Sequence, residues 1–155
     1  MIRVLFVCLG NICRSPMAEA VFLQLVKQAA LEARIEVDSA GTGDWHLGQP
    51  PHAGTLDVLQ RNGVPVSSRA RQVRLDDLTG FDYLITMDER NTHDVLELSK
   101  SAPRAHVARL LEFVPEFDDK NVPDPYFSGD FDGVYALVST GCVRLLQHIR
   151  REQNV

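Results

Sequence analysis

A cysteine and an arginine separated by five residues form the strongest chemical signal in the sequence, at Cys8 and Arg14. The residues between and directly after them are Leu9, Gly10, Asn11, Ile12, Cys13 and Ser15. A loop of this length between a strand and a helix can turn its backbone N–H groups toward one bound phosphate. Arg14 can donate two parallel hydrogen bonds to phosphate oxygens. Cys8 is then expected as a thiolate, a nucleophile placed behind the phosphoryl group.

The simpler interpretation of an isolated cysteine is a small, buried apolar side chain. Here the preceding apolar run and the following helix start agree with the spacing of Cys8 and Arg14, so a phosphate-binding loop is favoured. Ser15 is predicted to cap that helix and Pro16 to open it, while Gly10 is expected to let the loop bend. The loop is not a Walker motif, because no G-K-[ST] is present.

A thiolate that attacks phosphorus needs a proton donor for the departing oxygen. Asp124 is the best candidate, because Pro123 and Pro125 stiffen the chain on both sides of it. The alternative is a plain turn residue, which local sequence alone favours for an Asp beside Pro. Three aromatic side chains are predicted to wall a slot for an aromatic ring of the substrate: Trp45, Tyr126 and Phe127. The alternative for Tyr126 and Phe127 is that they cover the hydrophobic core.

The elements that must position these residues alternate between strand and helix. Apolar or alternating runs predict strands over 2–7, 35–40, 81–87 and 105–111. Helical periodicity predicts helices over 17–33, 53–62, 88–100 and 131–151, with a helical turn at 75–79. This order predicts a single α/β domain over 1–155: a four-stranded parallel sheet with helices on both faces, doubly wound and Rossmann-like. Ligands then bind where the strands end, in the loops 8–15, 41–52, 86–90 and 112–130.

Composition excludes several classes of protein. The chain has 155 residues, 45% of them hydrophobic, which suits one globular domain that needs no staple. A net charge of −5 argues against binding to nucleic acid or to a membrane. Three cysteines, an odd number, indicate a reducing cytoplasm. No metal or cofactor is expected, because Cys8 and Cys13 form no C-x-x-C pair and the histidines at 46, 52, 93, 106 and 148 are scattered.

Four segments resemble the low-molecular-weight protein tyrosine phosphatases, and the likeness covers nearly the whole chain. They are VCLGNICRSPMAEA near the N-terminus, ARQV at 70–73, FDYLITMDERN at 81–91 and DPYF near the C-terminus. The resemblance implies that Cys8 is the nucleophile, that Arg14 binds the phosphoryl oxygens and that Asp124 is the general acid. It implies a cysteinyl-phosphate intermediate, no metal, and tyrosine-phosphorylated proteins as substrates.

The resemblance also assigns supporting roles. Asn11 and Ser15 are implied to shape the loop, with the Ser15 hydroxyl donating to the thiolate. Asp88 matches a supporting acid, for which a helix N-cap is an equally good explanation. Ser68 stands where some relatives have a His that orients the Asn. Relatives with a second cysteine at the position of Cys13 can form a disulfide with the nucleophile.

Two other functions compete with this prediction. A thiol-dependent arsenate reductase shares loop and fold but needs a further cysteine pair; residues 75–100 contain no cysteine and Cys142 stands alone. A phosphate- or phosphopeptide-binding module without turnover is disfavoured by the intact set of Cys8, Arg14 and Asp124. The oligomeric state is left open, with a monomer as the default expectation.

Overall fold

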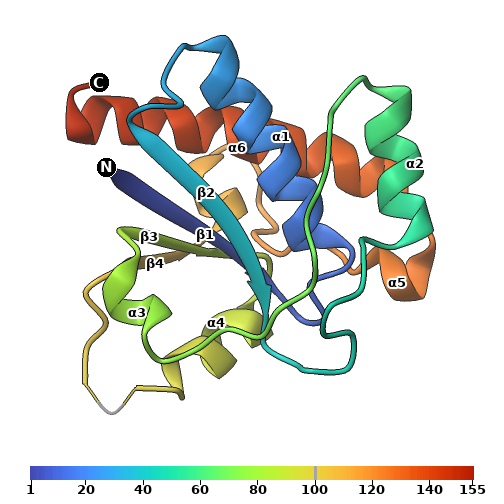
Figure 1. Cartoon of the computed structure of the whole chain (residues 1–155), viewed down its shortest axis with the longest axis horizontal. Helices are drawn as coiled ribbons and strands as arrows, with labels where there is room; N and C mark the ends of the chain where they lie inside the picture. The colour runs from blue at the N-terminus through green and yellow to red at the C-terminus, as the bar shows by residue number, and fades with distance from the viewer. Residues whose placement is uncertain (100) are drawn as a thin grey trace.

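Four parallel strands form the centre of the computed structural model, in the order β2-β1-β3-β4 (Figure 1). The strands are β1 (Ile2–Cys8), β2 (Ile35–Gly41), β3 (Tyr83–Thr86) and β4 (His106–Arg109). The structure describes residues 1–99 and 101–155. Because β2 and β3 lie on opposite sides of β1, the strand order reverses at the carboxyl end of β1, where ligands bind in such sheets. Cys8 is the last residue of that strand.

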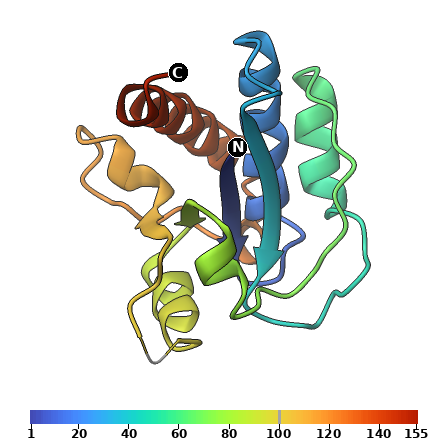
Figure 2. The same ribbon diagram turned by 60° about the vertical axis from the view of Figure 1, so that its left-hand side comes forward.

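Helices cover both faces of the sheet (Figure 2). One face carries α1 (Arg14–Gln28), α2 (Ala53–Arg61) and α6 (Phe131–Gln153). The other carries α3 (Asp77–Gly80) and α4 (Glu89–Leu96). The predicted four-stranded, doubly wound parallel sheet is therefore confirmed. Within the described residues, no helix combines the length and the apolar content needed to cross a bilayer.

The run at the start of the chain is apolar throughout because both faces of β1 are covered. Val4, Phe6 and Cys8 belong to the core under α1 and α6, whereas Leu5 and Val7 belong to the core under α3 and α4. All five are buried. A central strand of a parallel sheet reads as such a continuous run, and its burial on both sides makes the end of β1 a fixed anchor for the loop that follows.

The first helix differs from its prediction at both ends. It begins at Arg14 with Cys13 as N-cap; Ser15 is not the cap, because its hydroxyl lies inside a buried polar cluster with Cys8. It ends at Gln28 rather than continuing to residue 33. Ala30, at φ 56°, takes a left-handed conformation that ends the helical hydrogen bonding.

The segment after β4 is more ordered than the loop predicted over 112–130. The strand predicted over 105–111 gives way to a short 3-10 helix, η1 (Leu110–Phe113), and a single-turn helix, α5 (Pro125–Ser128), follows later. Pro125 suits the first turn of a helix, since that position needs no N–H donor. The third strand is shorter than predicted, and the helix predicted over 88–100 ends at Leu96; residue 100 lies outside the described residues.

Candidate active site

The loop between β1 and α1 presents a row of backbone N–H groups without acceptors. None of the N–H groups from residue 9 to residue 14 donates to another of the described residues. The N-cap of α1, Cys13, makes no side-chain capping hydrogen bond either. Buried N–H groups almost always have a partner, and the positive end of a helix adds to their attraction for an anion. The loop is therefore built to bind an anion.

Asn11 holds this loop in shape. Its φ is 57°, a left-handed conformation in which Asn is tolerated. Its Nδ2 donates to the Oγ atoms of Ser15 and Ser39 at 2.7 and 3.0 Å, and its Oδ1 accepts from the backbone N of Arg71 at 2.9 Å. Ser68 contributes one step further out, with its Oγ 3.5 Å from Ser39 Oγ. Asn11 is thus held by three groups that it contacts directly, without a His at position 68.

Gly10 lies in the bend of the loop, as expected, and it also allows a close approach. The left-handed residue of the loop is Asn11, and a Cβ on Gly10 would lie 3.1 Å from Cδ2 of His46. His46 lines the same cavity as Cys8, although it belongs to none of the sequence motifs. The available signal was its position in the loop after β2, where a sheet of this order binds ligands.

Cys8 is buried, and its Sγ lies 3.0 Å from Ser15 Oγ. Ser15 Oγ accepts from Asn11 Nδ2, and its own hydrogen has two acceptors within reach: the sulfur at 3.0 Å and, farther away, the carbonyl oxygen of Ala40 at 3.4 Å. Asn11, Ser15 and Cys8 thus form a short chain of hydrogen bonds that ends on the sulfur atom. Such a chain stabilises negative charge at its end.

Arg14 is 2% exposed and is held by one of its nitrogens. Its Nη1 donates to Asp88 Oδ2 at 2.7 Å and to the carbonyl oxygen of Val122 at 2.9 Å. Nη2 makes one long contact of 3.4 Å with Asp124 Oδ2, and Nε is buried with no partner among the described residues. The guanidinium is therefore anchored through Nη1, and its Nε–Nη2 edge remains able to donate to two ligand oxygens.

Charge around Arg14 keeps the guanidinium protonated. Burial by itself lowers its pKa, but Cys8, Asp88 and Asp124 outweigh that effect and the net pKa is raised. Asp88 contributes through both of its oxygens: Oδ2 accepts from Arg14, and Oδ1 accepts from Asn91 N at 2.8 Å as the N-cap of α4. The supporting-acid and helix-cap interpretations of Asp88 are therefore compatible.

The two carboxylate oxygens of Asp124 also make different contacts. It is the N-cap of α5, with its Oδ1 accepting from Tyr126 N at 3.1 Å. Its Oδ2 lies on the side of Arg14, and the residue lines the same cavity as Cys8. The turn geometry thus fixes one carboxylate oxygen and leaves the other directed toward the loop.

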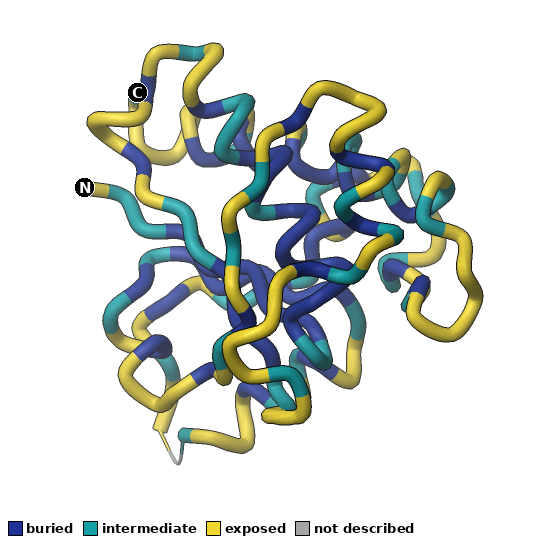
Figure 3. The backbone as a smooth tube through the Cα atoms, turned by 45° about the vertical axis from the view of Figure 1, so that its right-hand side comes forward, coloured by how far each residue is buried: buried dark blue, intermediate teal, exposed yellow. Residues whose placement is uncertain are grey.

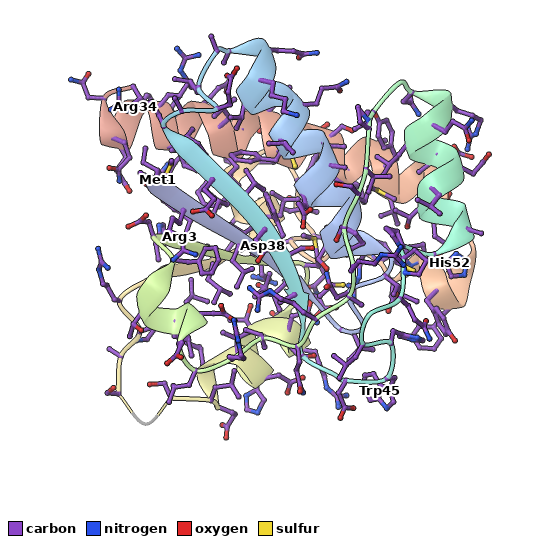
Figure 4. All side chains as sticks on the ribbon, viewed as in Figure 1. Met1, Arg3, Arg34, Asp38, Trp45 and His52 are labelled. Atoms are coloured by element: carbon purple, nitrogen blue, oxygen red, sulfur yellow. The ribbon has the colours of Figure 1, made fainter. Side chains whose placement is uncertain are left out.

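The cavity has a volume of about 390 Å³. It is lined by Cys8, Leu9, Gly10, Ile12, Cys13, Trp45, His46, Asp124, Tyr126 and Phe127. Trp45 is 66% exposed and Phe127 is 75% exposed, so Phe127 does not cover the core. The loop between β2 and α2 is mostly exposed (Figure 3); Trp45 lies on its outer side, and His52 lies beside α5 (Figure 4).

The second cysteine of the loop differs from the first. Cys13 is a free thiol, as are Cys8 and Cys142. Burial, with smaller contributions from the charges of Cys8 and Asp124, raises the pKa of Cys13 to about 12. Cys13 is therefore neutral at physiological pH, and a disulfide with Cys8 stays a prediction.

Comparison with known proteins gives one consistent result. Residues 3–155 match the family model described as low molecular weight phosphotyrosine protein phosphatase. The chain is 48% identical over 156 residues to the low molecular weight protein-tyrosine-phosphatase YfkJ of Bacillus subtilis, with both chains fully covered. It is 39% identical to PtpA of Staphylococcus epidermidis, covering 100% of this chain and 98% of the relative.

Solved structures agree with the sequence comparisons. The crystal structure of YfkJ superposes with a TM-score of 0.95 at 49% identity, covering 98% of this chain and 96% of that one. A structure described as drosophila arginine phosphatase superposes with a TM-score of 0.89 at 33% identity, covering 95% and 97% of the two chains.

Proposed function

The chain belongs to the low molecular weight phosphotyrosine protein phosphatase family, and from this premise we propose that it hydrolyses phosphotyrosine in proteins with Cys8 as nucleophile, Arg14 as phosphate ligand and Asp124 as general acid. One observation carries the assignment. Cys8, residues of the loop with unpaired amides and Asp124 line one cavity, and Arg14 adjoins it, with its Nη2 3.4 Å from Asp124 Oδ2 and its Nε without a partner among the described residues. These are the groups that phosphoryl transfer to sulfur requires.

In the first step the thiolate of Cys8 attacks phosphorus opposite the ester oxygen. The S–P bond forms while the bond from phosphorus to the tyrosine oxygen breaks. Asp124 donates its proton to that oxygen, so that a neutral phenol leaves. The loop amides and the Nε–Nη2 edge of Arg14 donate to the equatorial phosphoryl oxygens throughout, which stabilises the charge of the transition state.

In the second step Asp124, now a carboxylate, takes a proton from water. The water oxygen forms a bond to phosphorus, the S–P bond breaks, and inorganic phosphate leaves. Cys8 returns to the thiolate and Asp124 to the protonated acid, so the cycle closes without a redox partner. Asp124 is well placed for both proton transfers because its backbone is fixed at the start of α5.

The rim supports an aromatic ester. Trp45, His46 and Tyr126 surround the cavity above the buried sulfur. A phosphotyrosine reaches further from its backbone than a phosphoserine by most of a ring, so its ring fits between these side chains while its phosphate reaches the loop. All the groups come from one chain, which supports action as a monomer, and the three free thiols support a reducing, cytoplasmic setting.

The test compares phosphopeptides of one sequence that carry phosphotyrosine, phosphoserine or phosphoarginine, in buffer containing EDTA. The expected result is fastest phosphate release from phosphotyrosine, with a burst of cysteinyl-phosphate that acid quenching traps on Cys8. Faster release from phosphoarginine would assign the site to the substrate named for the drosophila relative. No trapped adduct on Cys8 would refute the proposed nucleophile.

A further inference from the structure

Two of the histidines that are scattered in the sequence meet in the fold. His106 opens β4, and His148 lies on α6 one helical turn before Glu152. Ligand atoms of all three side chains lie within 4.8 Å of one another. We propose that His106, His148 and Glu152 form a binding site for a divalent transition metal, best suited to zinc, at the end of the sheet opposite the phosphatase site.

The backbone fixes the approach of these three side chains. His106 is paired with Tyr83 in the register of β3 and β4, so both side chains lie on the sheet face that α6 covers. His148 and Glu152 share one face of α6, since residues four apart lie above each other on a helix. The segment after β4 lies beside the C-terminal half of α6 (Figure 2). Strand and helix therefore supply the ligands, not a mobile loop.

The donor set matches the chemistry of zinc. Two imidazole nitrogens and one carboxylate oxygen are a common protein ligand set for Zn²⁺, which leaves one position for solvent. Neighbouring ligands of a tetrahedral zinc lie roughly 3.4 Å apart, given bonds of about 2.1 Å. His148 Nε2 lies 3.3 Å from Glu152 Oε2, in that range. His106 is exposed and can rotate to close the remaining gap.

Hydrogen bonding leaves the ligand atoms available. His148 Nε2 is buried, and among the described residues it faces only Glu152 Oε2, with which it can form an ion pair when the imidazole is protonated and which a metal ion could bridge instead. Tyr83 Oη donates to the other oxygen of Glu152 and accepts from Gln153 Nε2 at 3.1 Å. Outer partners of this kind orient a ligating carboxylate and strengthen a metal site.

The three side chains lie beside a cavity. Phe113 packs edge-on against His148 with ring centroids 5.0 Å apart, and a cavity of about 490 Å³ opens beside the two histidines. Arg144, which also lines it, is paired with Glu116, so its charge is largely compensated. Arg151 is a second cation on this wall. The site is independent of the phosphatase chemistry, because His106 begins its strand whereas Cys8 ends its own.

The experiment is calorimetric titration with zinc chloride of the full-length chain carrying Cys8→Ser and Cys13→Ser, since thiols of the phosphate loop are themselves zinc ligands. The expected result is binding of one zinc ion. His106→Gln and His148→Gln should each weaken it at least tenfold, and Tyr83→Phe, which keeps all three ligands, by about 10- to 100-fold. His93→Gln is the matched control: His93 and Glu97 form a similar pair on α4, at 3.7 Å, outside the proposed ligand set.

A second readout protects the test against variants that fold poorly. In NMR spectra of the protein that carries only Cys8→Ser and Cys13→Ser, called the parent protein, amide signals of residues 106, 148 and 152 should shift on zinc addition. Signals around residue 93 should not shift. Absence of binding in the parent protein, or unchanged affinity in both His106→Gln and His148→Gln, would overturn the proposal. Shifts confined to other histidines would overturn it as well.

Discussion

The floor and the rim of the phosphatase cavity are built in opposite ways. The floor, residues 8–15, is almost entirely buried, and its polar side chains are held by defined hydrogen bonds. The rim, formed by Trp45, His46, Tyr126 and Phe127, is mostly exposed and lies on two separate segments. Rigid, buried groups stabilise a transition state because they need no reorganisation. Exposed rings contribute contact area, which affects how substrates are chosen and bound rather than how the bond is broken.

Among substitutions in the floor, Cys8→Ser should cause the largest loss of activity. A serine hydroxyl is not ionised at neutral pH, so turnover should fall by about 10⁴-fold or more. The loop amides and Arg14 remain, so inorganic phosphate should still bind in a calorimetric titration. Metal-independent turnover near the wild-type rate would place the nucleophile elsewhere.

The two roles of Asp124, as general acid and as N-cap of α5, can be separated by substitution. Asp124→Asn keeps an acceptor for Tyr126 N, because Asn caps helices as well as Asp does, but it removes the acidic proton. Both Asp124→Asn and Asp124→Ala should slow phenol release from phosphotyrosine by about 10²- to 10⁴-fold. A leaving phenol that is already acidic should show a much smaller defect in rapid-mixing measurements.

The outcome that contradicts an acid role is specific. If Asp124→Asn reacts like wild type and only Asp124→Ala is slow, the residue acts as the cap of α5 alone. Equal dependence on leaving-group pKa in wild type and Asp124→Asn would lead to the same conclusion.

Arg14→Lys tests the geometry of the floor while keeping its charge. A single ammonium cannot replace Nη1 on Asp88 and the Nε–Nη2 edge on phosphate at once. We expect a loss of about 10²- to 10³-fold in kcat/KM, the range seen when one transition-state donor is removed. Arg34→Lys is the control and should stay near wild type, because Arg34 is exposed and lies just before β2, at the end of the sheet opposite Cys8. A near wild-type rate for Arg14→Lys would rule out the two-oxygen contact.

The floor was predictable because its residues are contiguous. Cys8 to Ser15 lie between one strand and one helix, so spacing alone indicated an anion-binding loop. The partners of that loop were not predictable in the same way. Asn11 is held by Ser39 and by the backbone of Arg71, and His46 closes on Gly10; these contacts depend on how separate loops pack, which carries no local pattern.

Helix ends were the least predictable part of the fold. Ser15-Pro16 has the composition of a helix start, but the serine hydroxyl contacts Cys8, and the helix begins two residues earlier, at Arg14. Pro125 is typical of a loop, but proline is equally suited to open a helix such as α5. In both places a tertiary contact or a cap decided between two local possibilities.

Cys13 tests the floor under oxidation. Burial raises the pKa of Cys13 to about 12 and keeps this thiol protonated, so Cys13→Ser should leave kcat within about threefold of wild type. Conversion of Cys8 to a sulfenic acid removes the nearby negative charge, one of the causes that raise the Cys13 pKa, and favours attack by Cys13. Peroxide inactivation should therefore be reversed by thiol in wild type and in Cys142→Ala, but not in Cys13→Ser. Equal recovery in all three proteins would leave Cys13 a packing residue.

Trp45→Ala should have a small effect and should act on the rim alone. An aromatic pair contributes about 0.5–1.5 kcal/mol beyond buried area, so kcat/KM for a phosphotyrosine peptide should fall roughly 2- to 13-fold. The match for this variant is Leu47→Ala: Leu47 lies in the same loop and is 57% exposed, but it does not line the cavity. Inhibition by inorganic phosphate should be unchanged in both variants, because phosphate contacts only the floor. If Trp45→Ala weakens phosphate inhibition as much as peptide turnover, the loop after β2 supports the floor, and floor and rim do not act separately. If Leu47→Ala loses as much activity as Trp45→Ala, the loss comes from a disturbed loop and not from the missing ring.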